Sequence, residues 1–273
     1  MIKRVLKSVK SILFADPKLL YKEEIQLVNK PFHFKGENEQ GILLVHGWTS
    51  TPYELRRLGT YLNEQGYTVY APILTGHGTM PKDLEGVHWT DWLLDIKKAY
   101  EKLKQENKKV YVCGTSIGSN LAILLAAENP DIAGLVLMAT PYKIKFEFPA
   151  VLFARFLLLF RKYNKKHYPP TFGLSSTITR LISYQTYPIR SALEVHEIIQ
   201  KSVESLPKIT QPCLIIQSAH DHIVQRKSLE EIYKKINSKI KKKVYIPRAY
   251  HTFISDIKVG HIFENILEFI KEN

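Results

Sequence analysis

The sequence predicts an α/β fold with a mostly parallel central sheet, helices on both faces and an inserted cap. Short apolar, β-rich segments recur along the 273 residues and alternate with segments of helical period. Such alternation is typical of a parallel sheet that is covered on both faces. The alternation stops between about residues 141 and 206, and this interruption predicts the cap.

The predicted strands are mostly continuous apolar runs, which favours central positions that are buried on both sides. The predicted helices between them have helical length and period. The strands are expected at 41–46, 68–71, 109–113, 133–138, 213–217 and 243–246, and the helices at 53–65, 89–104, 116–128, 228–236 and 257–271.

The cap region contains an apolar run at 151–160 that is interrupted by Arg155. This run is too short to span a bilayer. Two interpretations fit it equally well. It is either an ordinary core helix, or a helix that covers the substrate and lines an apolar pocket with one face.

The chain divides into a basic amphipathic N-terminal segment, 1–36, and one domain, 37–273, with the cap inserted at about 141–206. Near the start of the chain, apolar side chains fall on one helical face and basic ones on the other. The segment lacks the apolar core and cleavage site of a signal peptide. It predicts either peripheral contact with a membrane or packing against the domain or an oligomer partner.

The net charge of +13 raises the question of nucleic-acid binding. The lysines are spread along the chain and interleaved with acidic residues, as on ordinary solvated surfaces. No nucleic-acid-binding module is recognisable, so we expect no such partner. Cys113 and Cys213 lie in apolar strand-like runs, which predicts buried thiols and is compatible with a cytoplasmic protein. The oligomeric state is not predicted.

The most informative motif is Gly114-Thr115-Ser116-Ile117-Gly118. A predicted strand precedes it and an apolar helical stretch follows, which is the context of a nucleophile elbow. A serine held on such a turn is exposed to a base and to backbone N–H groups that stabilise an oxyanion. Taken alone, the motif also fits a glycine-containing turn with a capping serine.

Two further candidate catalytic residues are expected at the same edge of the sheet. Asp221 follows the strand at 213–217, and His251 follows the strand at 243–246. Sites in open α/β sheets gather beyond the carboxyl ends of the strands. The order Ser116, Asp221, His251 therefore predicts a catalytic triad. Backbone N–H groups of Trp48, after the first predicted strand, and Ile117 are the predicted oxyanion donors.

With these motifs, the chain resembles the α/β-hydrolase superfamily, and in particular its bacterial carboxylesterase and monoacylglycerol-lipase-like branch. The resemblance covers the chain from about residue 40 to its end. Besides the elbow and the segments around Asp221 and His251, it rests on the segments 46–52, 72–78 and 89–92.

The resemblance implies that Ser116 is the nucleophile, that His251 is the general base and acid, and that Asp221 orients His251. It also implies that Trp48 and Ile117 form the oxyanion hole, with Trp48 in the substrate pocket as well. No cofactor and no metal are expected. The expected reaction is hydrolysis of short- to medium-chain acyl esters through an acyl-enzyme, with a small ester as the partner molecule.

Several alternatives stay open at this stage. Acyl transfer, peptide or C–C bond hydrolysis and haloperoxidase chemistry use the same triad and fold. A non-catalytic ligand or membrane-surface binder is a further possibility. His220 and His222 flank Asp221 but have no further ligand cluster, which disfavours a metal site. His46 and His77 are predicted to be structural or pocket-lining, and Ser119 stands where these esterases often carry a glycine.

Overall fold

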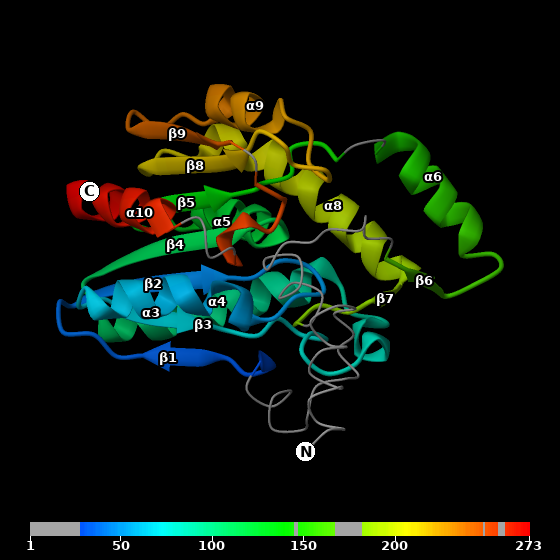
Figure 1. Cartoon of the computed structure of the whole chain (residues 1–273), viewed down its shortest axis with the longest axis horizontal. Helices are drawn as coiled ribbons and strands as arrows, with labels where there is room; N and C mark the ends of the chain where they lie inside the picture. Colours follow the sequence, from blue (N-terminus) through cyan, green and yellow to red (C-terminus); the bar gives the residue numbers. More distant parts are fainter. Residues whose placement is uncertain (1–27, 145–146, 167–181, 248, 256–259) are drawn as a thin grey trace, which may run out of the picture.

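The computed structural model describes residues 28–144, 147–166, 182–247, 249–255 and 260–273. Its centre is a seven-stranded sheet in the order β1-β3-β2-β4-β5-β8-β9 (Figure 1). All neighbouring strands run parallel except β1, which pairs antiparallel with β3. The strands are β1 (Phe32–Phe34), β2 (Gln40–Val45), β3 (Thr68–Ala71), β4 (Lys109–Thr115), β5 (Gly134–Met138), β8 (Cys213–Ser218) and β9 (Lys241–Ile246).

This architecture confirms the predicted α/β fold. The six predicted strands are all present, with shifts of two residues or fewer at their ends. The sequence analysis missed β1 because it has only three residues. A strand of that length is too short to show a reliable alternation. Phe32 of β1 is nevertheless buried against the helix that follows β2.

Two layers of helices cover the sheet and form two apolar cores. On one face, α3 (Arg56–Glu64) and α10 (Gly260–Glu272) pack over side chains of β2, β3 and β4. On the other face lie α4 (Trp89–Glu106), α5 (Ile117–Glu128) and α9 (Ser228–Lys235). Ten residues of α5 are buried, so this helix is apolar all round, as expected of a helix enclosed between the sheet and its neighbours.

Short 3-10 helices connect several of these elements: η2 (Pro52–Leu55), η3 (Pro81–Leu84), η4 (Leu206–Lys208) and η5 (Phe253–Ser255).

Both free cysteines are buried, which confirms the prediction of buried thiols. Burial raises the pKa of Cys213 to about 12, so its thiol stays protonated.

The segment between β5 and β8, where the alternation of strands and helices is interrupted, contains two helices and a two-stranded ribbon. These are α6 (Glu147–Leu157), the antiparallel pair β6 (Tyr163–Lys165) and β7 (Thr186–Pro188), and α8 (Ile189–Ser205). Helix α8 packs against α5, and α6 lies beside α8 at the periphery (Figure 1). Helix α8 is absent from the predicted helices, although its apolar residues recur at helical spacing. It links the interruption to the main core through Ile198 and Ile199, which are fully buried.

The structure corrects the interpretation of the apolar run 151–160. The interpretation as a core helix is wrong, because no residue of α6 is buried. The interpretation as a pocket-lining helix is wrong as well, since α6 contributes none of the described lining residues of the main pocket, whereas α8, β6 and β7 of the same region do. The apolar run thus faces outward.

The amphipathic pattern predicted near the start of the 1–36 segment lies outside the described residues, which begin at Val28. Within the described part of the chain, no helix combines the length and the apolar character that crossing a membrane requires.

Candidate active site

Ser116 lies between β4 and α5, on the turn that the sequence predicts. Its backbone has φ 53° and ψ −126°, a strained conformation for a residue with a side chain. The turn is possible because Gly118 passes directly under the end of β2. A Cβ at Gly118 would lie 2.2 Å from the carbonyl oxygen of Val45. Strain of this kind at a partly buried serine between a strand and a helix is characteristic of a nucleophile elbow.

The structure brings Ser116, His251 and Asp221 into one hydrogen-bonded line. His251 Nε2 lies 3.0 Å from Ser116 Oγ, and His251 Nδ1 lies 2.7 Å from Asp221 Oδ2. The other carboxylate oxygen of Asp221 accepts the N–H groups of Ile223 and Val224 at 2.8 and 2.9 Å. Asp221 is therefore fixed on both oxygens, and it directs the ring of His251 toward the serine.

The negative charge of Asp221 and the positive charge of protonated His251 stabilise each other. Burial works against the charged form of both Asp221 and His251. Their mutual attraction and hydrogen bond outweigh this, so the pKa of Asp221 lies below its usual value and the pKa of His251 lies above its own. This arrangement lets His251 take up a proton while Asp221 remains ionised.

The two predicted oxyanion residues, Trp48 and Ile117, both lie in the wall of the pocket that contains Ser116. The loop that carries Trp48 reaches the elbow at Gly47, where a Cβ would lie 3.4 Å from the Cβ of Ser116. Ile117 is the first residue of α5, so the positive end of the helix dipole is directed toward the serine.

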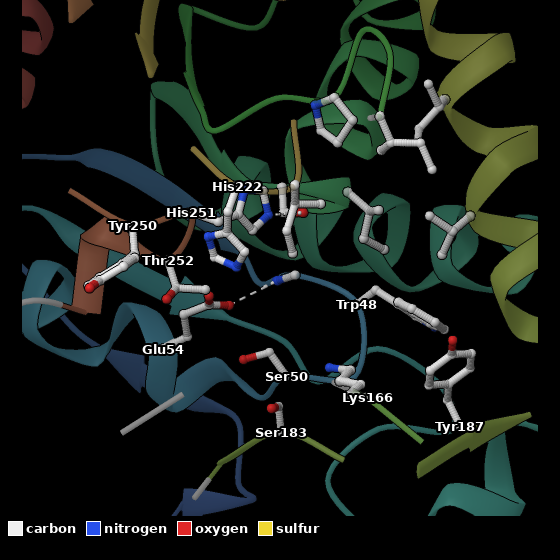
Figure 2. Close-up of a pocket in the computed structure, with 18 of the residues that line it drawn as sticks. Trp48, Ser50, Glu54, Lys166, Ser183, Tyr187, His222, Tyr250, His251 and Thr252 are labelled. Carbon is white, nitrogen blue, oxygen red and sulfur yellow. Dashed lines mark hydrogen bonds between the residues drawn. The ribbon is translucent and has the colours of Figure 1, made fainter. Parts of the chain in front are cut away.

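The Trp48 side chain connects this loop to the cap region. Its indole N–H donates to Ser191 Oγ on α8 at 2.8 Å, and its ring packs edge-on against Tyr187 of β7 at 4.8 Å between centroids. Lys166 Nζ lies 5.7 Å from the centroid of the indole ring. Trp48 thereby holds the loop, α8 and the β6–β7 ribbon together around the pocket (Figure 2).

Sequence reasoning missed Glu54, a buried carboxylate beside the site. Glu54 Oε2 accepts the N–H of Gly47 at 3.1 Å and so holds the loop that leads to Trp48 (Figure 2). Burial raises its pKa, although its hydrogen bonds and the nearby charges of His251 and Lys166 partly oppose this shift. A glutamate near the start of a helix is ordinary in a sequence, so nothing in the chain distinguishes this one before folding.

The pocket has a volume of about 490 Å³, and its lining residues form an aliphatic and a polar group, called its apolar and polar sides below. Ser116 and His251 also line it. Figure 2 shows Ser50, Ser183 and Lys166 gathered along one wall. The apolar side is lined by Ile117, Pro141, Ile144, Val195, Ile199 and Ile223, and the polar side by Ser50, Glu54, Lys166 and Ser183.

The remaining candidate histidines have other roles. His46 accepts the N–H of Leu74 on Nε2 at 3.1 Å, and its Nδ1 lies 2.9 Å from the carbonyl oxygen of Gly47. Burial lowers its pKa to about 4, so it is a neutral brace for the loop. His77 packs edge-on against His46 in the interior. His222 lines the pocket, with its ring centroid 6.4 Å from that of His251.

The described residues contain no group of three or more His, Cys, Asp or Glu side chains that could hold a metal ion. His220 belongs to the loop around Asp221, where its N–H donates to Ser218 Oγ. Ser119, which replaces a glycine common in the resembling esterases, donates its hydroxyl to the carbonyl oxygen of Gly114 at 2.7 Å. This hydrogen bond ties the first turn of α5 to the end of β4.

Comparison with known proteins places this geometry in a family. Residues 36–258 match the family model described as serine aminopeptidase, S33. The chain belongs to this family of α/β-hydrolases. It is 31% identical over 235 residues to a thermostable monoacylglycerol lipase of Bacillus sp. (strain H-257), which covers 85% of this chain and 91% of that protein. It is 29% identical over 244 residues to a carboxylesterase of Bacillus subtilis (strain 168), covering 89% and 96%.

Solved structures agree with the fold. A structure reported for LipS and LipT, two metagenome-derived lipolytic enzymes, superposes with a TM-score of 0.82 at 27% identity and covers 90% of this chain and 98% of the other. A monoacylglycerol lipase of Paleococcus ferrophilus has the same fold, with a TM-score of 0.75 at 18% identity, covering 89% and 98%. This α/β-hydrolase is thus an enzyme of the esterase and lipase group.

Proposed function

We propose that this α/β-hydrolase cleaves short- to medium-chain acyl esters of small polar alcohols through an acyl-enzyme on Ser116. The observation that carries the proposal is the continuous line from Ser116 through His251 to Asp221, at 3.0 and 2.7 Å. This line opens into a pocket that is apolar on one side and polar on the other.

In the proposed mechanism, His251 Nε2 accepts the Ser116 proton as Oγ attacks the ester carbonyl carbon. The N–H groups of Trp48 and Ile117 stabilise the oxyanion. The tetrahedral intermediate collapses, and His251 returns the proton to the departing alcohol oxygen. A water molecule, deprotonated by the same nitrogen, then attacks the acyl-enzyme and releases the acid and the free serine.

The two sides of the pocket support the substrate class. The aliphatic side chains of Val195 and Ile199 on α8 suit an acyl chain, and the pocket volume of about 490 Å³ limits its length. The polar wall with Ser50 and Ser183 suits the hydroxyl groups of a small polyol. A monoacylglycerol combines both features, and one curated relative is named for that activity.

The identity of the nucleophile is tested by treating the protein with a fluorophosphonate and measuring its intact mass by mass spectrometry. We expect one adduct on Ser116, no adduct in Ser116→Ala, and an unchanged adduct in the surface control Ser205→Ala. Ester hydrolysis should fall by roughly 10⁴-fold or more in Ser116→Ala. Labelling or hydrolysis that survives in this variant would overturn the assignment.

The preferred length of the acyl chain is tested with nitrophenyl esters from acetyl to palmitoyl. We expect kcat/KM to peak at short to medium chains, and Val195→Phe to move the peak to shorter chains because it fills the apolar side. Ser183→Ala, on the polar side, should leave the chain-length profile unchanged and weaken discrimination between glycerol and methyl esters. A profile that rises toward palmitoyl, or one that Val195→Phe leaves in place, would contradict this assignment of the two sides.

The family description also names aminopeptidases, so peptide hydrolysis is a second activity to compare. Lys166 lines the polar side, and its positive charge disfavours the free amino group of a peptide substrate. We therefore expect nitrophenyl acyl esters to be cleaved and aminoacyl nitroanilides to be left intact. Faster cleavage of the nitroanilides would reassign the reaction.

A further inference from the structure

The polar side of the pocket carries a positive charge that the proposed mechanism does not use. Lys166, directly after β6, lines the pocket, and its ammonium group donates a hydrogen bond to Thr49 Oγ1. Threonine is uncharged, so this bond holds the ammonium group in place without neutralising it. The charge of Lys166 acts against the upward shift in the pKa of both His251 and Glu54. The ammonium group therefore lies within electrostatic reach of the reacting atoms.

Two buried hydroxyl groups lie along the same wall as Lys166 (Figure 2). Ser50 is 4% exposed and Ser183 is 3% exposed, and both line the pocket. Ser50 Oγ makes no hydrogen bond of normal length and angle with the described residues, although Glu54 is close enough for this hydroxyl to act on the pKa of its carboxyl group. A buried hydroxyl in this situation is expected to meet a partner in the pocket. Hydroxyl donors beside an ammonium group suit a ligand with negatively charged oxygen atoms.

The charge balance of the pocket indicates which anion fits. Apart from histidines, the charged side chains in the described lining are Lys165, Lys166 and Glu54. Two lysines and one glutamate leave one positive charge in excess, which a carboxylate balances. A phosphate monoester carries nearly two negative charges and would be repelled more strongly by Glu54. The described lining also has no arginine, the side chain that binds phosphate through two parallel hydrogen bonds.

We propose that Lys166, together with Ser50 and Ser183, selects acyl esters whose alcohol portion carries a carboxylate, that is, acyl esters of hydroxy acids. The proposal rests on the proposed ester hydrolysis and narrows its small polar alcohol to an anionic one. The acyl chain lies on the apolar side, and the carboxylate of the departing hydroxy acid meets Lys166 on the polar side. Neutral glycerol esters still fit the pocket, but they gain nothing from the charge of Lys166. The proton transfers between Ser116 and His251 are unchanged.

The proposal is tested with two hexanoyl esters of nearly equal shape, the anionic para-hexanoyloxybenzoate and the neutral para-hexanoyloxybenzamide. After correction for uncatalysed hydrolysis, we expect the wild-type kcat/KM to favour the anion by about tenfold. Lys166→Met should remove this preference by lowering kcat/KM for the benzoate alone, and Lys166→Arg, which keeps the charge, should retain most of it. Equal kcat/KM for the two esters in the wild type would overturn the proposal.

The matched control is Lys162→Met, which removes an exposed positive charge three residues before β6 ends and outside the described pocket lining. This variant should keep the wild-type preference. A preference lost equally in Lys162→Met and Lys166→Met would reveal a general effect of surface charge and overturn the role of Lys166. If Lys166 only supported the fold through Thr49, Lys166→Met would lower kcat/KM for both esters by the same factor, which would also overturn the proposal.

Fluorophosphonate labelling of Ser116 reports whether each variant retains a folded site. If Lys166→Met were misfolded, Ser50→Ala would serve as the second test, because it removes a hydroxyl without creating a buried charge. We expect Ser50→Ala to lower the preference for the benzoate while kcat/KM for the benzamide stays near the wild-type value. An unchanged preference in Ser50→Ala, together with wild-type labelling, would count against the anion site.

Two further comparisons separate this proposal from its alternatives. If neither benzoate nor benzamide ester were cleaved, the proposed hydrolysis itself would be wrong, whereas cleavage of both at one rate would refute only the selection by Lys166. Hexanoylglycerol phosphate, compared with hexanoylglycerol, tests the other anion. A preference for this phosphate larger than that for the benzoate, and lost in Lys166→Met, would overturn the assignment to a carboxylate. A preference for the succinyl over the butanoyl nitrophenyl ester that Lys166→Met removes would instead place the anion on the acyl portion and overturn its assignment to the alcohol.

Discussion

At the scale of single residues, the proton affinity of His251 is set by charges from several separate elements. Asp221 bonds to it from the loop after β8, Glu54 approaches from η2, and Lys166 acts from the end of β6. The two carboxylates favour the imidazolium and Lys166 opposes it. The net effect places the pKa of His251 above its usual value of 6.5.

This shift predicts the pH dependence of ester hydrolysis. In the proposed mechanism His251 must be neutral to accept the Ser116 proton, so activity should be lost as the pH falls through its pKa. Because that pKa is raised, the acidic limb of kcat/KM should have its midpoint above 6.5. Rates measured between pH 5 and pH 9 on a nitrophenyl ester would check this. A midpoint below 6.5 would mean that burial outweighs the carboxylates in the free enzyme.

Glu54 gives a second prediction at this scale, with two substitutions that separate its hydrogen bond from its charge. Glu54→Gln keeps an oxygen that accepts the Gly47 N–H but removes the negative charge. We expect kcat near the wild-type value and an acidic limb shifted to lower pH, because the imidazolium loses a favourable charge. Full pH profiles of kcat/KM for both proteins would measure the shift. An acidic limb that stays in place would show that Glu54 carries no charge near neutral pH.

Glu54→Leu removes the acceptor as well and leaves the Gly47 N–H buried without a partner. The cost of such a group is about 1–3 kcal/mol, and it falls on the loop that carries Trp48, the proposed oxyanion donor. We expect a fall in kcat of about tenfold or more, with KM changed less. Equal kinetics for Glu54→Gln and Glu54→Leu would contradict a role of Glu54 in holding this loop.

The position of three site residues could be predicted from the sequence, whereas that of Glu54 could not. Ser116, Asp221 and His251 each follow a predicted strand, and strand ends of a parallel sheet meet at one edge. Their proximity could therefore be predicted from spacing and order. Glu54 acts through a contact that forms only when η2 folds back against the loop at Gly47, seven positions earlier in the chain. No pattern in one sequence records that contact.

At the scale of elements, the elbow depends on the close approach of α5 to the end of β2. A methyl group at Gly118 would lie 2.2 Å from the Val45 oxygen and 2.7 Å from the His46 oxygen, both of them backbone atoms that cannot yield cheaply. Gly118→Ala should therefore lower the free energy of unfolding by ~3 kcal/mol or more and abolish fluorophosphonate labelling.

The matched control is Gly260→Ala at the start of α10, where a Cβ meets nothing within 4 Å. Alanine is the better helix former by about 1 kcal/mol, so this variant should be as stable as the wild type or slightly more so. Thermal and urea unfolding followed by circular dichroism compare the two. Similar stability of Gly118→Ala and the control would show that the elbow tolerates a side chain.

The strands were predictable and the cap region was not, for a physical reason. A strand such as 213–217 is buried on both faces, so its apolar run has one interpretation. The apolar run of α6 resembles a buried segment in composition, yet the structure leaves it exposed on α8. Local sequence reports how apolar a segment is. It does not report whether the segment is buried. Helix α8 already covers the adjacent face of α5, so α6 packs outside α8.

At the scale of the whole molecule, the described part of the chain, which begins at Val28, contains the seven-stranded sheet, two apolar cores and the pocket. The two apolar cores draw on residues from Phe32 onward, and the described pocket wall begins at Gly47. The earliest described contact of the chain with the site region is the carbonyl oxygen of Val28, which accepts the hydroxyl of Thr51 at 2.6 Å. This bond supports the loop between Trp48 and η2, so we expect the autonomous domain to include Val28.

A chain of residues 28–273 is therefore expected to fold and to hydrolyse a water-soluble nitrophenyl ester at close to the full-length rate. A chain that begins at residue 30 loses the Val28 acceptor and should be slightly less stable, by about 0.5–1.5 kcal/mol, with the triad intact. Urea unfolding and kcat/KM of both truncated proteins measure these effects. Aggregation of the 28–273 protein, or loss of its activity, would show that the N-terminal segment belongs to the domain. In that case the basic amphipathic face would have to pack against the enzyme rather than remain available to a membrane.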